Sequence, residues 1–294
     1  RVERRTYAAL LRRAPALRLV AISADQAASA PELRFAAVCP NGLDVDAFPY
    51  GDRPGPYLLF LGRISPDKGV ADAIRIARDA ELPLRIAAKC REPEERRHFA
   101  EVVEPAIGPG VEWLGEVGRD EKAALLAGAR ALVFPIAWRE PFGMVMVESM
   151  ACGTPVLATP LGAVPEVVRD GITGFLRPDA AGLAEAASGL DQIDRAACRA
   201  HVAERFSAGA LTAGYERLLD RLAGSSPLAR FAGRRNERLP VRRIDVLQRE
   251  SQEQQNHDDL DRDDDVIDEG GLGDAAIAKP EHCNNDRDGG KVED

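Results

Sequence analysis

Short apolar runs alternate with helical stretches from Tyr57 to about Leu222. Within this region Val70, Ala73 and Ile74 fall on one face of an expected helix. The expected strands are Tyr57–Leu61, Leu84–Ala88, Val111–Leu114, Ala131–Phe134, Pro155–Ala158 and Gly174–Leu176. Apolar strands separated by amphipathic helices predict an α/β fold, with a Rossmann-like parallel sheet and helices on both faces.

The first 50 residues hold much less of this pattern. One helical stretch, Thr6 to Ala16, precedes two apolar runs, Leu19–Ile22 and Phe35–Val38. They amount to about one α/β unit, which is too little to bury an independent core. We therefore expect three parts: a short N-terminal segment over 1–50, the sheet domain over 51–224, and a tail over 225–294.

The tail differs from the rest of the chain in charge and composition. Residues 251–294 hold 15 Asp and Glu against 4 Lys and Arg, a net charge of −11. The whole chain carries −9, so residues 1–250 carry +2. A segment with so few large apolar residues predicts disorder, with a partner-binding arm as the alternative. The nearly neutral body shows no electrostatic signature for nucleic acid.

The five cysteines are widely spaced, without a Cys-x-x-Cys pair or a histidine at metal-ligand spacing. This pattern predicts free thiols in a reducing, cytoplasmic compartment. No apolar run reaches the ~18–20 residues that a membrane span needs. The first residues lack an initiator Met and a secretory apolar region, so we expect that the N-terminus is a cut or processed end.

The first chemically suggestive loop runs from Leu61 to Gly69. Ser65 suits a helix N-cap and Pro66 suits the first helical position, so a helix starting there places Lys68 in its first turn. Together with Arg63, two cations would then face the carboxyl edge of the sheet, where α/β folds bind ligands. An anionic ligand such as a diphosphate would explain them. The alternative is that Asp67 neutralises Lys68 and both point to solvent.

The second loop runs from Trp138 to Glu148. Pro141 and Gly143 force a turn before a helix expected from Met144 to Ala151, which leaves the amides of its first turn available. Glu140 before this helix and Glu148 one turn inside it could accept hydrogen bonds from the hydroxyls of a sugar-like ligand whose phosphates bind those amides. Taken alone, Glu148 also fits a surface acid favoured by the helix dipole.

These residues resemble a known family. Glu140-Pro141-Phe142-Gly143 followed by Glu148 is similar to the two-glutamate signature, with seven residues between the glutamates, of retaining family-4 glycosyltransferases of the GT-B fold. Further motifs agree in order and spacing: Asn41-Gly42-Leu43-Asp44, Gly62-Arg63 with Lys68-Gly69, Gly115-Glu116-Val117, Ala151 to Val156, Pro165 to Val168, and Asp170 to Phe175. The sequence departs from the family pattern at Gly162-Ala163, where the family often has two glycines.

The resemblance implies that residues 51–224 form a nucleotide-sugar donor domain. Residues 1–50 would be the remnant of an N-terminal acceptor domain, most of which is missing, and the interdomain segment. Arg63 and Lys68 would bind the donor diphosphate, Glu140 the hydroxyls of the transferred sugar, and Glu148 the ribose. The implied catalytic set is Glu140, Arg63 and Lys68, and the implied donor-binding set adds Gly62, Val117, Phe142, Gly143, Met144, Val145 and Glu148.

Such enzymes resemble front-face retaining catalysts that use neither an enzyme nucleophile nor a metal, so we expect no cofactor. The expected donor is UDP-glucose-like or GDP-mannose-like, and the acceptor, a glycan, lipid or small molecule, stays open. The three adjacent aspartates Asp263 to Asp265 fit a solvated charge run in the tail. The alternative function is a nucleotide-sugar binding fragment without transfer activity. An epimerase would need acid and base groups from the opposite domain, and a phosphorylase a lysine for pyridoxal phosphate that no motif offers.

Two further expectations concern histidines and membranes. His98 and His201 lie in helical stretches and are expected at the surface, so neither replaces the histidine that the family often carries in its acceptor domain. Peripheral membrane contact is not indicated, because no basic amphipathic N-terminal helix is expected and the basic stretch from Arg230 to Arg243 is unpatterned.

Overall fold

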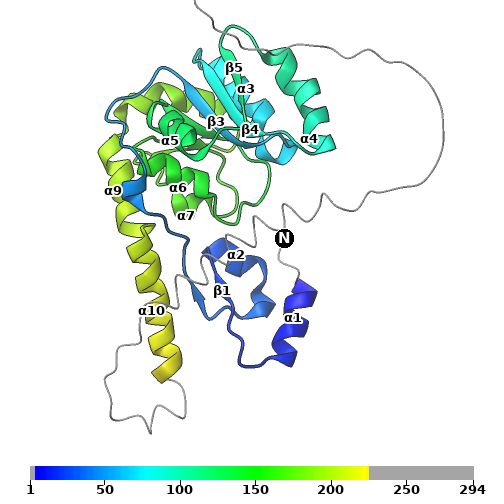
Figure 1. The fold of residues 1–294 in the computed structure, drawn as a ribbon, viewed down its shortest axis with the longest axis vertical. Coiled ribbons are helices and arrows are strands. Elements are labelled where there is room, and N and C mark those ends of the chain that lie inside the picture. The colour runs from blue at the N-terminus through cyan, green and yellow to red at the C-terminus, as the bar shows by residue number, and fades with distance from the viewer. Residues whose placement is uncertain (1–3, 225–294) are drawn as a thin grey trace, which may run out of the picture. The chain divides into compact units, whose positions relative to one another are not determined.

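A parallel sheet of six strands is the larger of two sheets in the computed structural model, which describes residues 4–224 (Figure 1). In this part of the chain six strands pair in the order β5-β4-β3-β6-β7-β8, and every pairing is parallel. Their bounds are β3 Leu58–Arg63, β4 Leu84–Lys89, β5 Val111–Gly115, β6 Ala131–Phe134, β7 Val156–Ala158 and β8 Gly174–Leu176. All the expected strands are confirmed, two with the same bounds and four with ends that differ by one or two residues.

The strand order places a topological switch point at the middle of the sheet. From β3 the chain first adds strands on one side, β4 and β5, and then crosses back to add β6, β7 and β8 on the other. The order reverses between β3 and β6, and doubly wound α/β folds bind ligands beyond the carboxyl ends of the strands at this point.

Helices cover both faces of the sheet, as the sequence predicts (Figure 1). One apolar cluster packs α3 (Val70–Asp79) and α8 (Ala180–Ala186), and the other packs α5 (Arg119–Ala127), α6 (Met144–Ala151) and α9 (Arg195–Arg205). Within β6, Ala131 and Val133 belong to the first cluster, and Leu132 and Phe134 to the second. Burial on both faces explains why these strands are continuous apolar runs.

Shorter elements complete the described part of the chain. The other helices after β3 are α4 (Pro93–His98), α7 (Val164–Val167) and α10 (Ala208–Gly224). Short turns of 3-10 or π helix lie at Pro31–Leu33, Val45–Ala47, Pro66–Lys68, Phe99–Val103, Glu104–Ala106 and Ala187–Gln192. The N-terminal segment contains α1 (Arg4–Arg13), β1 (Val20–Ala21), α2 (Ala24–Ser29) and β2 (Ala37–Val38). β1 and β2 pair in parallel around α2, which is the single α/β unit expected there.

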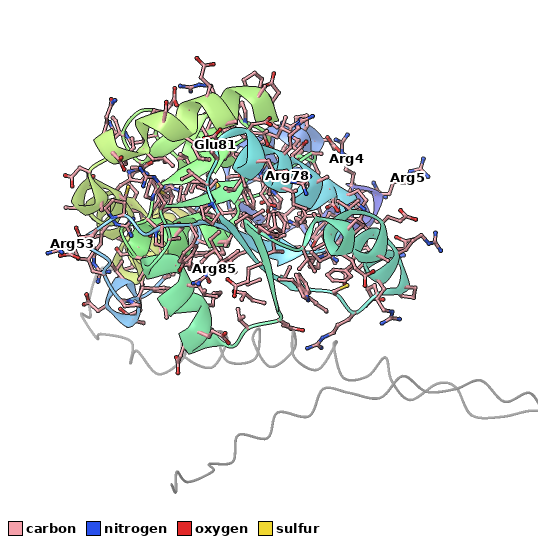
Figure 2. All side chains as sticks on the ribbon, turned by 90° about the horizontal axis from the view of Figure 1, so that it is seen from above. Arg4, Arg5, Arg53, Arg78, Glu81 and Arg85 are labelled. Carbon is pink, nitrogen blue, oxygen red and sulfur yellow. The ribbon has the colours of Figure 1, made fainter. Side chains whose placement is uncertain are left out.

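The expectation that no basic amphipathic helix occurs near the N-terminus is wrong. α1 starts at Arg4, two residues before the expected start, and ends before Pro15, so it carries arginines at both ends. Its side chains of Tyr7 and Leu10 are 40% and 44% exposed. Figure 2 shows Arg4 and Arg5 on this helix, with Arg5 pointing outward.

Residues 43–51 are attached to the sheet domain by backbone pairing and by two arginines of α9. The amide of Leu43 donates to the carbonyl of Phe206 at 2.9 Å. Arg195, which is 6% exposed, donates to the carbonyls of Gly51, Ala127 and Ala129 and to the hydroxyl of Thr154. Arg199 donates to the carbonyls of Phe48, Val45 and Ala151. The division at residue 50 stays a prediction, and the expected tail over 225–294 lies outside the described residues.

His201 is buried, so its expected surface position is wrong. Its side chain is on the inward face of α9, where Nε2 lies 2.9 Å from the carbonyl oxygen of Val167 and the ring meets Phe206 edge to face. Only 5% of His201 is exposed. The sequence could not reveal this, because the neighbouring α7 that covers His201 comes from a distant part of the chain. His98 is half-buried at the end of α4.

We expect that His201 makes the protein less stable in mild acid. Burial lowers the pKa of the His201 imidazole below its ordinary value of 6.5. As the pH falls below the pKa of His201 in the unfolded chain, the unfolded chain binds a proton at His201 and the folded chain does not. The free energy of unfolding therefore decreases until the pH reaches the lower pKa of the folded protein. His201→Gln, which keeps an N–H donor, should lose less melting temperature between about pH 7 and pH 5 than the wild type. Equal losses in the two proteins would contradict this.

Candidate functional site

A cavity of about 400 Å³ lies at the carboxyl edge of the sheet, at the switch point between β3 and β6. Its wall combines the ends of β3, β4 and β6, the segment after β5, and the start of α6. The predicted site residues that line it are Gly62, Lys68, Val117, Glu140, Gly143, Met144, Val145 and Glu148. The structure therefore brings most of the predicted set, drawn from three separate loops, into one cavity.

Lys68 reaches the cavity from a turn that precedes α3. The helix does not begin at Ser65 and Pro66 as expected: Pro66–Lys68 is a 3-10 turn, and α3 begins at Val70 after Gly69. Gly69 has a left-handed φ of 77°, and a Cβ there would lie 2.0 Å from the carbonyl oxygen of Pro135. This close approach of the turn to the end of β6 interrupts the helix and puts Lys68 just ahead of it.

Lys68 and Glu140 form an ion pair inside the cavity. Nζ of Lys68 lies 3.0 Å from Oε2 of Glu140, and the two side chains are 18% and 9% exposed. The same ammonium group stands 4.5 Å from the centre of the Trp138 ring. The alternative in which Asp67 neutralises Lys68 in solvent is therefore wrong, and the two loops singled out in the sequence meet through this pair.

Glu148 forms a second ion pair next to the first. It projects from α6, whose bounds match the expected Met144–Ala151, and its Oε1 lies 2.8 Å from Nζ of Lys122. Its side chain is 16% exposed, so it is not the freely solvated surface acid of the alternative interpretation. It faces the same cavity as Met144, one helical turn earlier.

Two cavity lysines were missed by the sequence reasoning. Lys89 ends β4, and Lys122 is the fourth residue of α5, the helix that follows β5. The signal was available for Lys89, which directly follows an expected strand at the carboxyl edge of the sheet, but not for Lys122, which lies within the next helix. Three lysines, including Lys68, and three glutamates, Glu116, Glu140 and Glu148, thus line the cavity.

Two predicted site residues do not line the cavity. Arg63 ends β3 with its side chain 54% exposed, and Nη1 stands 3.7 Å from Oε1 of the buried Glu95. Phe142 is 3% exposed and packs edge to face on Phe206, with ring centres 5.7 Å apart. The Phe142 ring belongs to the core, which leaves only its backbone for the predicted contact with a donor.

Thiols and metal-ligating side chains do not gather in the described part of the chain. Cys39, Cys152 and Cys198 are buried free thiols, and burial raises the pKa of Cys152 and of Cys198 to about 12. Across residues 4–224 no group of three or more His, Cys, Asp or Glu side chains is placed to hold a metal ion. No helix in that range is both long and apolar enough to cross a membrane.

Comparison with known proteins agrees with this geometry. Residues 55–192 match the family model described as "Glycosyl transferases group 1". These residues are thus similar to a group 1 glycosyltransferase domain. The match begins just before β3 and ends after α8, so it covers the sheet and the whole cavity.

Named relatives are similar over much of the chain. The phosphatidyl-myo-inositol mannosyltransferase of Mycolicibacterium smegmatis is 32% identical over 216 residues, which cover 67% of this chain and 55% of that protein. The glycogen synthase of Mycobacterium tuberculosis is 32% identical over 240 residues, covering 74% of this chain and 53% of that protein. The chain thus spans about half the length of these relatives.

Solved structures share the fold. AviGT4, a glycosyltransferase involved in avilamycin A biosynthesis, superimposes with a TM-score of 0.60 at 26% identity, over 70% of this chain and 64% of that one. Anabaena HepE, solved in complex with UDP and glucose, gives a TM-score of 0.61 at 19% identity, over 76% of this chain and 68% of that one. The expected fold class, the Rossmann-like half of a GT-B glycosyltransferase, is confirmed.

Proposed function

We propose that the cavity binds a nucleotide-sugar donor and that the whole protein is a retaining glycosyltransferase of family 4. It would transfer a hexose from a UDP-glucose-like or GDP-mannose-like donor to an acceptor that is still to be identified. The observation that carries the proposal is the pair of neighbouring ion pairs, Lys68 with Glu140 and Lys122 with Glu148, at the switch point of a group 1 glycosyltransferase domain.

The two ion pairs suit a ligand that has both phosphates and hydroxyls. A diphosphate entering the cavity would take the Lys68 ammonium, and the Glu140 carboxylate would then accept hydrogen bonds from the sugar. Bonds to charged groups are about twice as strong as neutral ones. Because only the donor carries the phosphates that bind Lys68, this contact favours the donor over free sugar. Glu148 would accept from the ribose, and the amides of Gly143, Met144 and Val145 at the start of α6 would face the phosphates.

Positive charge near the diphosphate also has a role during transfer. As the bond between sugar and phosphate breaks, charge builds up on the departing nucleoside diphosphate, and Lys68 stabilises it more strongly than in the ground state. The exposed guanidinium of Arg63, one residue beyond the lining residue Gly62, would assist at the mouth of the cavity. We propose that these cations replace a metal ion and that Glu140 is a binding group for the sugar and not a nucleophile.

The comparisons support transfer over binding alone. The mycobacterial relatives carry the names of a mannosyltransferase and a glycogen synthase, and both names describe the transfer of a sugar. Because the chain spans about half of each, activity belongs to the proposal for the whole protein. Buried free thiols at Cys39, Cys152 and Cys198 support a reducing, cytoplasmic compartment as part of the same proposal.

Calorimetric titration with UDP, GDP and ADP, and with their glucose or mannose conjugates, tests the donor site. We expect one nucleotide class to bind, equally well with Mg²⁺ and with EDTA. Binding that needs Mg²⁺ would overturn the metal-independent site. Failure of every nucleotide to bind this chain would overturn the proposal that its cavity is a functional donor site.

A further inference from the structure

Arg139, the residue before Glu140, is paired with an aspartate 114 positions away in the sequence. Nε of Arg139 donates to both carboxylate oxygens of Asp25, at 2.9 and 2.7 Å, and Nη2 donates to Oδ1 at 2.6 Å. Asp25 lies in α2 of the N-terminal segment, and its side chain is only 18% exposed. A guanidinium held by both oxygens of a carboxylate has little freedom to turn, so this pair sets the direction of the Arg139 side chain.

The same end of α2 is bound by a second carboxylate. Oε2 of Glu166 accepts from the amide of Ala24 at 2.8 Å, and Oε1 accepts from the amide of Asp25 at 2.7 Å. These amides are in the first turn of α2 and have no partner within the helix. Glu166 belongs to α7, so α2 is attached both to the loop that holds Glu140 and to α7.

The start of α7 in turn contacts Glu140. The amide of Ala163 donates to the carbonyl of Glu140 at 2.8 Å. Gly162 approaches so closely that a Cβ there would lie 2.3 Å from this carbonyl oxygen and 2.5 Å from the Glu140 amide nitrogen. The contacts close a ring: the Glu140 loop binds α2 through Arg139, α2 binds Glu166, and the segment leading into α7 binds the backbone of Glu140.

We propose that Asp25 and Glu166 are positioning residues for the Glu140 carboxylate, a role that rests on the proposed function. They lie outside the donor cavity and act on the peptide of Glu140 through Arg139 and through the segment that leads into α7. The Glu140 carboxylate then already has the orientation that binds the sugar, so it need not move on binding. Because Arg139 is 57% exposed, its ion pair with Asp25 adds little to the free energy of unfolding. The pair acts instead on the orientation of the loop that holds Glu140.

The test compares Asp25→Asn and Glu166→Gln, which keep the shape of each side chain, with the wild type. The measured quantity is the ratio of the dissociation constants of a nucleoside diphosphate and its sugar conjugate. We expect each variant to lower this preference for the conjugate about 3- to 10-fold, while the diphosphate itself binds within about 2-fold of wild type. Asp25→Asn combined with Arg139→Gln should be no worse than Arg139→Gln alone, since both remove the same contact.

Asp191→Asn is the matched control. It breaks the ion pair with Arg130, in which Nη2 also meets both carboxylate oxygens, at 2.7 and 2.6 Å. Arg130 precedes β6, at the amino end of the strands and away from the cavity. This variant should leave the ratio unchanged. An unchanged ratio in Asp25→Asn and Glu166→Gln, or an equal loss of diphosphate and conjugate binding, would overturn the positioning role.

A second readout does not depend on any ligand. Hydrogen exchange of the backbone over residues 138–143 should be faster in Asp25→Asn than in the wild type and in Asp191→Asn. If the wild type binds no nucleotide, the proposed function fails, whereas faster exchange would still show that Asp25 holds the Glu140 loop. Unchanged exchange would overturn the positioning role in either case.

Discussion

Lys68→Ala is expected to weaken nucleoside diphosphate binding about 10- to 100-fold, the equivalent of one hydrogen bond to a charged group. Lys68 is a lysine of the cavity that lies on the loop between β3 and α3, and its ammonium already stands beside the carboxylate expected to hold the sugar. The conjugate should lose at least as much affinity, because it carries the same diphosphate. Calorimetry with the nucleotide class that binds the wild type measures both losses.

The weaker binding expected in Lys68→Ala could have two causes, and a double variant separates them. Lys68→Ala removes the cation, but it also leaves the Glu140 side chain, only 9% exposed, without its partner. In Lys68→Ala combined with Glu140→Gln this carboxylate charge is gone as well. If the cation itself binds the phosphates, the double variant should bind the diphosphate as weakly as Lys68→Ala.

Arg75→Ala provides a charge-matched control for Lys68→Ala. Arg75 is paired with Asp72 at 2.9 Å on the exposed side of α3, and it does not line the cavity. Its removal changes the net charge equally and should leave the affinity within about 2-fold. If Lys68→Ala binds the diphosphate with wild-type affinity, Lys68 does not bind the phosphates and the proposed donor site is contradicted.

Glu140→Gln is expected to act on the sugar and not on the nucleotide. The substitution keeps the shape of the side chain but replaces a charged acceptor with a weaker neutral one. We expect the conjugate to bind about 10-fold more weakly, while the diphosphate binds as in the wild type or more tightly, because Lys68 is no longer paired. Once an acceptor is known, the transfer rate should fall about 10²- to 10³-fold.

Glu112→Gln is the control for Glu140→Gln. Glu112 pairs with Arg85 at 2.9 Å on the central sheet but does not line the cavity. The dissociation constants of the diphosphate and of its sugar conjugate should both be unchanged in Glu112→Gln. Equal losses of UDP and UDP-sugar affinity in Glu140→Gln would contradict the division of roles between Lys68 and Glu140.

Local patterns along the chain were enough to predict the sheet, and the family resemblance added residues such as Gly62 and Val117 to the predicted cavity. Strands such as β6 are apolar on both faces because helices cover both sides, so they are visible as continuous runs. The cavity follows from the same logic, since parallel strands bring the loops after β3 and β6 to one edge. Glu140 and Glu148 were found because both lie close to the start of one helix, α6.

Local sequence patterns did not predict the contacts between distant segments. The burial of His201 depends on Val167 and Phe206, and the start of α3 depends on how closely Gly69 approaches Pro135. Neither contact leaves a periodic trace in the local sequence. Lys122 also needed the structure, because an ordinary lysine in a helix becomes a site residue only when its partner, Glu148, is opposite it.

The amino-acid sequence therefore specifies the α/β class, the strand positions and the types of side chain at the carboxyl edge of the sheet, since these depend on periodicity and on residues close together in the chain. Folding in three dimensions sets which charges meet. Lys68 pairs with Glu140 rather than with Asp67, and Arg139 of the Glu140 loop pairs with Asp25, 114 positions away, at the end of α2 that Glu166 also binds. Such pairings depend on packing across the whole domain, which no local pattern encodes.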